Sequence, residues 1–89
     1  MIQQDIKIIN QLGLHTRPAA LLAQTAANFV CDIQLSKDGV NVNAKSIMGL
    51  MMLAAEFGSF VTLTTNGSDA KEAFDTIKNL FDNKFNEEF

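Results

Sequence analysis

The residues of this chain that could do chemistry lie together in one short stretch. His15, Arg17 and Pro18 are the only histidine, arginine and proline among 89 residues, and they fall within four consecutive positions. A neutral imidazole is a nucleophile near pH 7. A guanidinium presents a fork of N–H donors that fits phosphate oxygens. This combination of residue types indicates a nucleophile beside a site for an anion.

A helix is predicted to begin directly after His15. Thr16 is the expected N-cap, and Pro18 suits the first turn, where its missing N–H is no loss. Apolar residues then recur at helical spacing as far as Phe29. Because the first turn of a helix carries unpaired N–H groups and the positive end of the helix dipole, it attracts anions. The stretch could therefore take up a phosphoryl group, although a turn histidine beside a solvated arginine would leave the same pattern.

The remaining sequence predicts one domain over residues 1–89 with the element order βαββαβα. The alternation of apolar and polar residues in the strands is typical of an antiparallel sheet with one solvated face. The expected fold class is α+β, an open-faced β-sandwich in which a four-stranded antiparallel sheet carries three helices on one face. The strands are predicted at 2–9, 32–37, 40–43 and 60–65, and the first two helices at 16–29 and 47–55.

The last helix is expected to follow Asp69. Asp69 and Glu72 have the spacing of a capping box at its start. Its apolar residues recur at i, i+3, i+4 and i+7, which predicts one buried face; they are Ala70, Ala73, Phe74, Ile77, Leu80 and Phe81. The final stretch, NKFNEEF, is predicted to be a tail that frays at its end.

Composition excludes several classes of protein. The chain has seven basic and ten acidic residues, so it lacks the basic surface that nucleic acids or anionic membranes require. Cys31 is the only cysteine, which allows neither an internal disulfide nor a cysteine-rich metal site, and we expect it to be a small buried side chain. The longest apolar run, 47–55, is too short to span a bilayer, and no signal-peptide pattern is present at the start. These features predict a cytoplasmic protein with no membrane insertion.

Two motifs give the chain a resemblance to a known family. GLHTRPAA at 13–20 and AKSIMGL at 44–50, at this separation and this distance from the start, are similar to the HPr family. HPr is the histidine-containing phosphocarrier protein of the bacterial phosphoenolpyruvate-dependent phosphotransferase system. The resemblance covers essentially the whole chain and agrees with the predicted element order. It implies a phosphoryl carrier rather than an enzyme, with no cofactor and no metal.

The resemblance also implies a role for individual residues. His15 would be phosphorylated through Nδ1, accepting the phosphoryl group from phosphorylated Enzyme I and passing it to an enzyme IIA. Arg17 would hold the phosphoryl oxygens, with Thr16 at the helix start. Ser46, a candidate N-cap of the second helix, would match the serine that an HPr kinase/phosphorylase modifies in some bacteria. A monomer is the expected form of such a shuttle.

The second helix is apolar almost all round, which in so small a domain indicates a surface for a partner. Methionines suit a surface that must fit more than one partner. The resemblance places one set of side chains on the face around His15, while Leu50 and Leu53 are expected in the core. The set comprises Ala20, Ile47, Met48 and Met51.

The resemblance leaves open whether the protein serves sugar uptake, a nitrogen-related phosphoryl relay or regulation alone. The acidic, Phe-containing ending is similar to the nitrogen-related paralogue NPr, and a purely regulatory binding protein acting through phosphorylated Ser46 is another candidate. A regulator of the Crh type lacks the active histidine, whereas His15 is present. A metal chaperone should show Cys-x-x-Cys near the first loop, and an acyl-phosphate hydrolase needs a site that positions water; neither is found in the sequence.

Overall fold

Seven strands and helices follow one another in the computed structural model, which describes all 89 residues. Their order is βαββαβα, as predicted. The bounds are β1 (Ile2–Lys7), α1 (Thr16–Ala26), β2 (Asp32–Lys37), β3 (Val40–Asn43), α2 (Ile47–Met52), β4 (Phe60–Asn66) and α3 (Ala70–Asp82).

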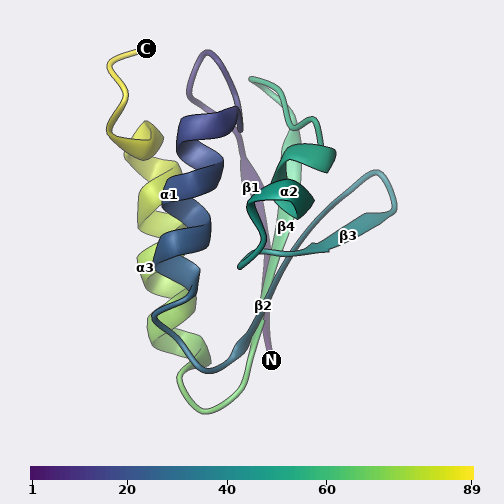
Figure 1. The fold of residues 1–89 in the computed structure, drawn as a ribbon, viewed down its shortest axis with the longest axis vertical. Coiled ribbons are helices and arrows are strands. Elements are labelled where there is room, and N and C mark those ends of the chain that lie inside the picture. Colours follow the sequence, from purple (N-terminus) through teal and green to yellow (C-terminus); the bar gives the residue numbers. More distant parts are fainter.

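The four strands form one open sheet in the order β1-β4-β2-β3, and every neighbouring pair is antiparallel. Helices α1 and α3 lie side by side along the sheet, and α2 packs against α1 and β3 (Figure 1). The predicted open-faced sandwich is therefore confirmed. The start of α1 and the C-terminal end of α3 meet at the same end of the molecule (Figure 1).

The core lies between the sheet and the helices. In strand β4 the alternating side chains point to opposite faces of the sheet: Val61 and Leu63 are buried in the core, while Phe60, at the start of the strand, is exposed. Ile33 and Leu35 of β2 are buried beside them. Helix α3 covers them with its predicted apolar face, of which Leu80 alone is only half-buried. The buried members of that face are Ala70, Ala73, Phe74, Ile77 and Phe81.

Three elements are shorter than predicted. Strand β1 ends at Lys7 rather than residue 9, and α1 ends at Ala26 rather than Phe29. Helix α2 ends at Met52, three residues before the predicted end. In each case the apolar residues continue beyond the end of the helix or strand, into a connecting segment whose side chains still contact the core. The spacing of apolar residues therefore predicts burial correctly but places the end of the regular backbone too late.

The predicted capping box at the start of α3 is wrong. Asp69 does occupy the N-cap position, but its side chain makes no hydrogen bond to the helix. Its carboxylate instead accepts the backbone N–H groups of Val30 and Cys31, each at 2.9 Å. The reason is tertiary: the segment that leads into β2 brings two unpaired N–H groups to this carboxylate, and they replace the helix as its donors.

The C-terminal stretch 83–89, predicted as a tail, folds back onto the molecule as far as Glu87. Residues Lys84, Phe85 and Asn86 form a left-handed turn, with φ of 56°, 54° and 63°. This turn folds the chain back, and the ring of Phe85 is fully buried against Phe81, with 4.9 Å between the ring centroids. The left-handed conformation costs roughly 1–2 kcal/mol per residue, and burial of a Phe ring offsets a large part of this cost.

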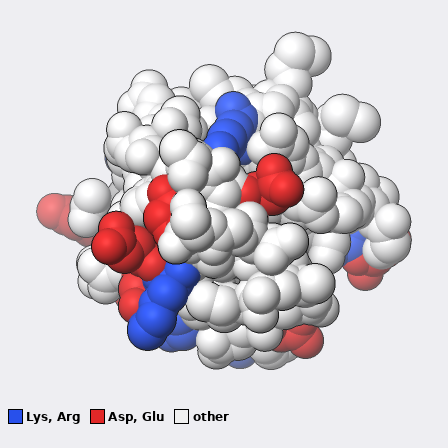
Figure 2. All heavy atoms as spheres, turned by 90° about the horizontal axis from the view of Figure 1, so that it is seen from below, with Lys and Arg blue, Asp and Glu red and all other residues white.

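The end of the molecule away from this tail carries no strong field of one sign. Figure 2 shows acidic and basic side chains scattered over it among mostly uncharged surface. None of the helices is long and apolar enough to span a bilayer.

Candidate functional site

His15 lies at the N-cap position of α1, one residue earlier than the predicted N-cap Thr16. Thr16 is instead the first residue of the helix, and no side chain caps this end. The first backbone hydrogen bond of α1 runs from the N–H of Ala19 to the carbonyl of His15. The N–H groups of Thr16 and Arg17 lie before it and have no carbonyl one turn earlier to bind, so they are available to an anion. Pro18 lies in the first turn, as predicted.

The loop before His15 is fixed tightly against the segment that follows α2. Leu14 donates its N–H to the carbonyl of Ala55 at 2.9 Å, and its side chain is buried. Gly13 has φ of +68°, and a Cβ there would lie 2.5 Å from the oxygen of Ala55. Only glycine therefore fits at position 13, and this close approach sets the entry of the chain into α1.

The imidazole of His15 is about one-third exposed and makes one hydrogen bond. Its Nε2 lies 2.7 Å from Oε2 of Glu87, whose side chain is only 5% exposed. Nδ1 makes no hydrogen bond to the helix. Leu12, Leu14 and Phe57 line a shallow hollow beside the ring. The ring thus has one nitrogen held by the protein and the other free to react.

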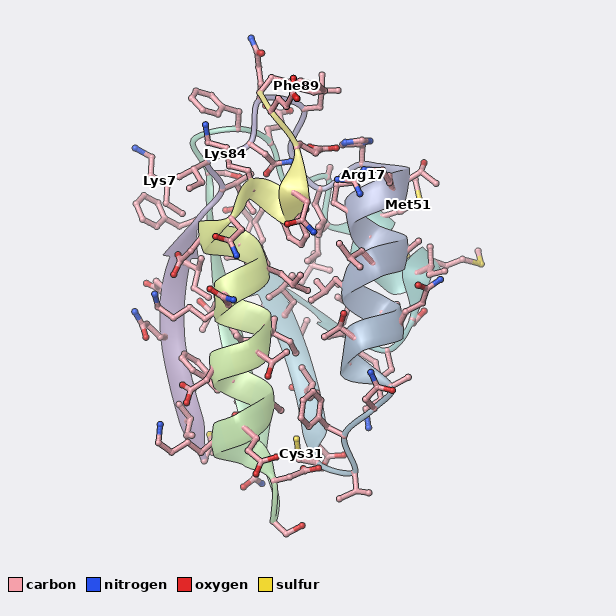
Figure 3. The ribbon with its side chains drawn as sticks, turned by 90° about the vertical axis from the view of Figure 1, so that its left-hand side faces the viewer. Lys7, Arg17, Cys31, Met51, Lys84 and Phe89 are labelled. Atoms are coloured by element: carbon pink, nitrogen blue, oxygen red, sulfur yellow. The ribbon has the colours of Figure 1, made fainter.

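Arg17 also contacts the C-terminal tail. Its Nη2 donates to the carbonyl of Phe85, and its Nε lies 3.4 Å from Oε2 of Glu87. Figure 3 shows Arg17 at the same end of the molecule as Lys84 and Phe89. The side chain remains about half exposed, so the guanidinium can exchange its present acceptors for another anion.

Asn10 and Glu87 complete the site, and sequence reasoning missed both. Asn10 is 1% exposed, and its Nδ2 donates to the carbonyl of Gly13 at 2.7 Å and to Oε1 of Glu87 at 2.9 Å. One signal could have pointed to this arrangement: Phe85 follows Phe81 by four residues, so the apolar face of α3 continues into the tail. A tail with a buried ring at this position must keep close to the helix.

The carboxyl of Glu87 is ionised near neutral pH. Burial by itself would raise its pKa, but the hydrogen bonds from Asn10 and His15, with the charges of His15 and Arg17, act the other way. The result is a pKa below the ordinary value for Glu. A carboxylate in this state is only an acceptor of hydrogen bonds.

Ser46 occupies the N-cap of α2, as predicted. Its hydroxyl oxygen accepts the N–H of Gly49 at 3.0 Å. Of the predicted partner surface, Ile47, Met48 and Met51 are exposed and Ala20 is half-buried. Met51 lies at the same end of the molecule as Arg17 (Figure 3). The buried side of this helix is made by Leu50 and Leu53, also as predicted.

Cys31 is buried, as predicted, and lies at the opposite end of the molecule from Arg17 (Figure 3). Burial and the neighbouring Asp69 raise the pKa of its thiol, which keeps it protonated and unreactive. No group of three His, Cys, Asp or Glu side chains is arranged to hold a metal ion.

Comparison with known proteins gives consistent results. The family model described as "PTS HPr component phosphorylation site" matches residues 2–83. The chain is 54% identical over 87 residues to the phosphocarrier protein HPr of Cupriavidus necator, which covers 98% of both chains. It is similar to the crystal structure of HPr-C-His from Thermoanaerobacter tengcongensis, with a TM-score of 0.96, 46% identity and full coverage of both chains. The HPr dimer from the same organism matches with a TM-score of 0.79 and 46% identity, over 98% of this chain and all of that one.

Proposed function

Because the chain belongs to the HPr family of phosphocarrier proteins of the phosphotransferase system, we propose that His15 is the residue that carries the phosphoryl group. In this proposal His15 accepts the group from phosphorylated Enzyme I and passes it to an enzyme IIA. The observation that supports it most directly is the partly exposed imidazole at the start of α1. It is the only histidine of the chain, so no other imidazole could serve.

The surroundings of His15 suit the chemistry of transfer. The charge of a transferring phosphoryl group is spread over its three equatorial oxygens. The N–H groups of Thr16 and Arg17 and the dipole of α1 can stabilise this charge without rearrangement. The guanidinium of Arg17 adds two parallel donors once it leaves the Phe85 carbonyl. A carrier needs no deep substrate pocket, since it presents the group to one partner after another.

The docking surface for both partners is proposed to be the exposed face of α2 with the neighbouring part of α1. Its residues are Ala20, Ile47, Met48 and Met51. Exposed apolar side chains of this number on a short helix are costly unless a partner covers them. Flexible methionine side chains can repack against two different partners. We also propose that the protein is a monomer and that it meets both partners in the cytoplasm. Its mass in solution tests the monomeric state.

Ser46 is proposed as a second phosphorylation site, modified by an HPr kinase/phosphorylase where the cell has one. A phosphoryl group there would lie at the start of α2, where the backbone N–H of Gly49 can still donate to it. The helix would therefore keep its cap. The added negative charge beside the docking surface would weaken association with an acidic partner face and slow the transfer.

The test of the main proposal is a single reaction. The purified protein is mixed with Enzyme I, Mg²⁺ and phosphoenolpyruvate, and its intact mass is measured before and after acid treatment. We expect one added phosphoryl group that acid removes, and none on the His15→Ala variant. If the group never appears with the Enzyme I of the same organism, or appears on His15→Ala, the carrier role of His15 is wrong. The first result would favour a purely regulatory role through Ser46.

A further inference from the structure

The side chain of Glu87 is held in place from several sides. The left-handed turn at Lys84–Asn86 and the buried ring of Phe85 fix the tail. Asn10 then donates one amide N–H to Oε1 of Glu87, and with the other bond of its Nδ2 it holds the carbonyl of Gly13. The same amide thus joins the tail to the loop that carries His15. A carboxylate held in this way is positioned before any partner arrives.

The hydrogen bond to Glu87 determines which ring nitrogen of His15 is protonated. The Glu87 carboxylate is ionised and can only accept, so the 2.7 Å contact with Nε2 requires the proton to be on Nε2. In a neutral imidazole with Nε2–H, the lone pair in the ring plane is on Nδ1. Without the carboxylate, both tautomers would be populated.

We infer that Glu87 is a positioning residue for the phosphoryl transfer, acting through the tautomer and the charge of His15. This inference rests on the proposed function. The tail supplies a carboxylate to the imidazole as the third member of a Ser-His-Asp triad does, where it holds the ring in one tautomer and stabilises the imidazolium that forms. Nothing in the sequence near His15 provides such a group, so the fold brings it from the far end of the chain.

The transfer step balances with this arrangement. The lone pair of Nδ1 forms a bond to phosphorus while the bond from phosphorus to the donor breaks, and its electron pair stays with the donor. His15 keeps the proton on Nε2, so the ring becomes an imidazolium as the P–N bond forms. The buried carboxylate of Glu87 stabilises this positive charge across the hydrogen bond. The same interaction acts on the return step, when the ring becomes neutral again.

The first test reads the tautomer without any transfer reaction. Because His15 is the only histidine, its two ring nitrogens give an unambiguous ¹⁵N spectrum. In the wild type at a pH where the ring is neutral, we expect one tautomer, with the proton on Nε2. Glu87→Gln should give averaged shifts that report both tautomers. Glu88→Gln removes the same charge from the exposed neighbour and should leave the spectrum unchanged.

The second test measures the rate of phosphoryl transfer from phosphorylated Enzyme I. We expect Glu87→Gln to slow it by about tenfold, the loss expected for a hydrogen bond to a charged group. Glu87→Asp should recover part of the rate and Glu88→Gln all of it. A Glu87→Gln variant with wild-type ring shifts and a wild-type rate would overturn the inference. If no variant or wild type is phosphorylated at all, the proposed function fails instead, while the spectrum still decides whether Glu87 sets the tautomer.

Discussion

Oε2 of Glu87 lies 2.7 Å from Nε2 of His15, although 72 positions separate the two residues in the chain. The N-terminal and C-terminal parts of the chain both contribute to the site, since Asn10 precedes His15 and the tail follows the last helix. The consequence is that the position of the His15 imidazole depends on the folding of the final residues. Removing Phe85, which anchors the tail, should therefore change both the stability of the protein and its chemistry.

The lowered pKa of the Glu87 carboxyl predicts how the stability of the protein depends on pH. The pKa of Glu87 is below its ordinary value of 4.5, so the folded protein favours the ionised carboxyl. This contribution to the free energy of unfolding is present in full above the pKa of the unfolded chain and is lost as the pH falls through the lowered pKa. The difference in stability between the wild type and Glu87→Gln should shrink as the pH falls below about 5. Denaturant unfolding at a series of pH values measures it.

The matched control for this prediction is Glu88→Gln, which removes an exposed carboxyl one residue away. It should follow the wild type at every pH. A stability difference for Glu87→Gln that does not shrink below about pH 5 would contradict the assignment of the carboxyl as an ionised partner of Asn10 and His15.

The role of Arg17 predicts a loss of rate without a loss of fold. Its guanidinium is half exposed, so Arg17→Ala should leave the melting temperature within a few degrees of the wild type. Transfer from phosphorylated Enzyme I should slow by more than about tenfold, because the donors to the transferring oxygens are removed. Lys71→Ala, which removes an exposed positive charge on α3, should transfer at the wild-type rate. An unchanged rate for Arg17→Ala would remove its proposed role.

Substitutions at Ser46 separate the effect of its helix cap on stability from the effect of an added negative charge on transfer. Ser46→Ala loses the acceptor of the Gly49 N–H and should destabilise the protein by about 1 kcal/mol without slowing transfer. Ser46→Asp keeps an acceptor and should melt close to the wild type. Its added charge should slow phosphorylation by Enzyme I severalfold, and less at high salt, where charges are screened. Equal rates for both variants would leave Ser46 as a cap alone.

The sequence predicted most accurately the parts of the fold that local chemistry determines. Strands β2 and β3 have the predicted bounds because Asp38 and Gly39 form the turn between them, with φ of 51° and 83°. An Asp-Gly pair is favoured at two such positions. Ser46 was found as a cap for the same reason, since the group it binds is three residues away.

The parts that the sequence did not predict depend on long-range contacts. Asp69 accepts hydrogen bonds from backbone N–H groups that lie 38 and 39 positions away in the chain instead of from its own helix. Glu87 is bound by Asn10, which lies 77 positions away. Lys84 and Phe85 adopt positive φ although neither residue type favours it. Burial of Phe85 and the hydrogen bonds of Arg17 and Glu87 stabilise this turn, and the partners in those hydrogen bonds lie far away in the chain. The position of Arg17 against the tail follows from the same turn.

The backbone of Gly13 lies so close to the carbonyl of Ala55 that a side chain would not fit between them. Two glycine substitutions can measure how much this close contact contributes to stability. Gly39 has a similar positive φ of +83°, but a Cβ there would meet nothing within 4 Å. Gly39→Ala should therefore cost only the strain of the left-handed backbone, about 1 kcal/mol. Gly13→Ala should cost clearly more, on the order of 3 kcal/mol, because its Cβ would overlap the Ala55 carbonyl as well. Equal losses for the two variants would show that the contact at 2.5 Å is not needed.

Phe85 anchors the tail, so its removal should affect stability and transfer together. Phe85→Ala leaves a cavity beside Phe81, and we expect a loss of about 3–5 kcal/mol in the free energy of unfolding. Phe89→Ala shortens a half-exposed side chain two residues beyond Glu87 and should cost less than about 1 kcal/mol. The stabilities are compared by denaturant unfolding. Where Phe85→Ala still folds at low temperature, the ¹⁵N spectrum of His15 should show both tautomers, because Glu87 is no longer held against Nε2. A single Nε2–H tautomer in that variant would mean that Asn10 alone is enough to hold the carboxylate in place.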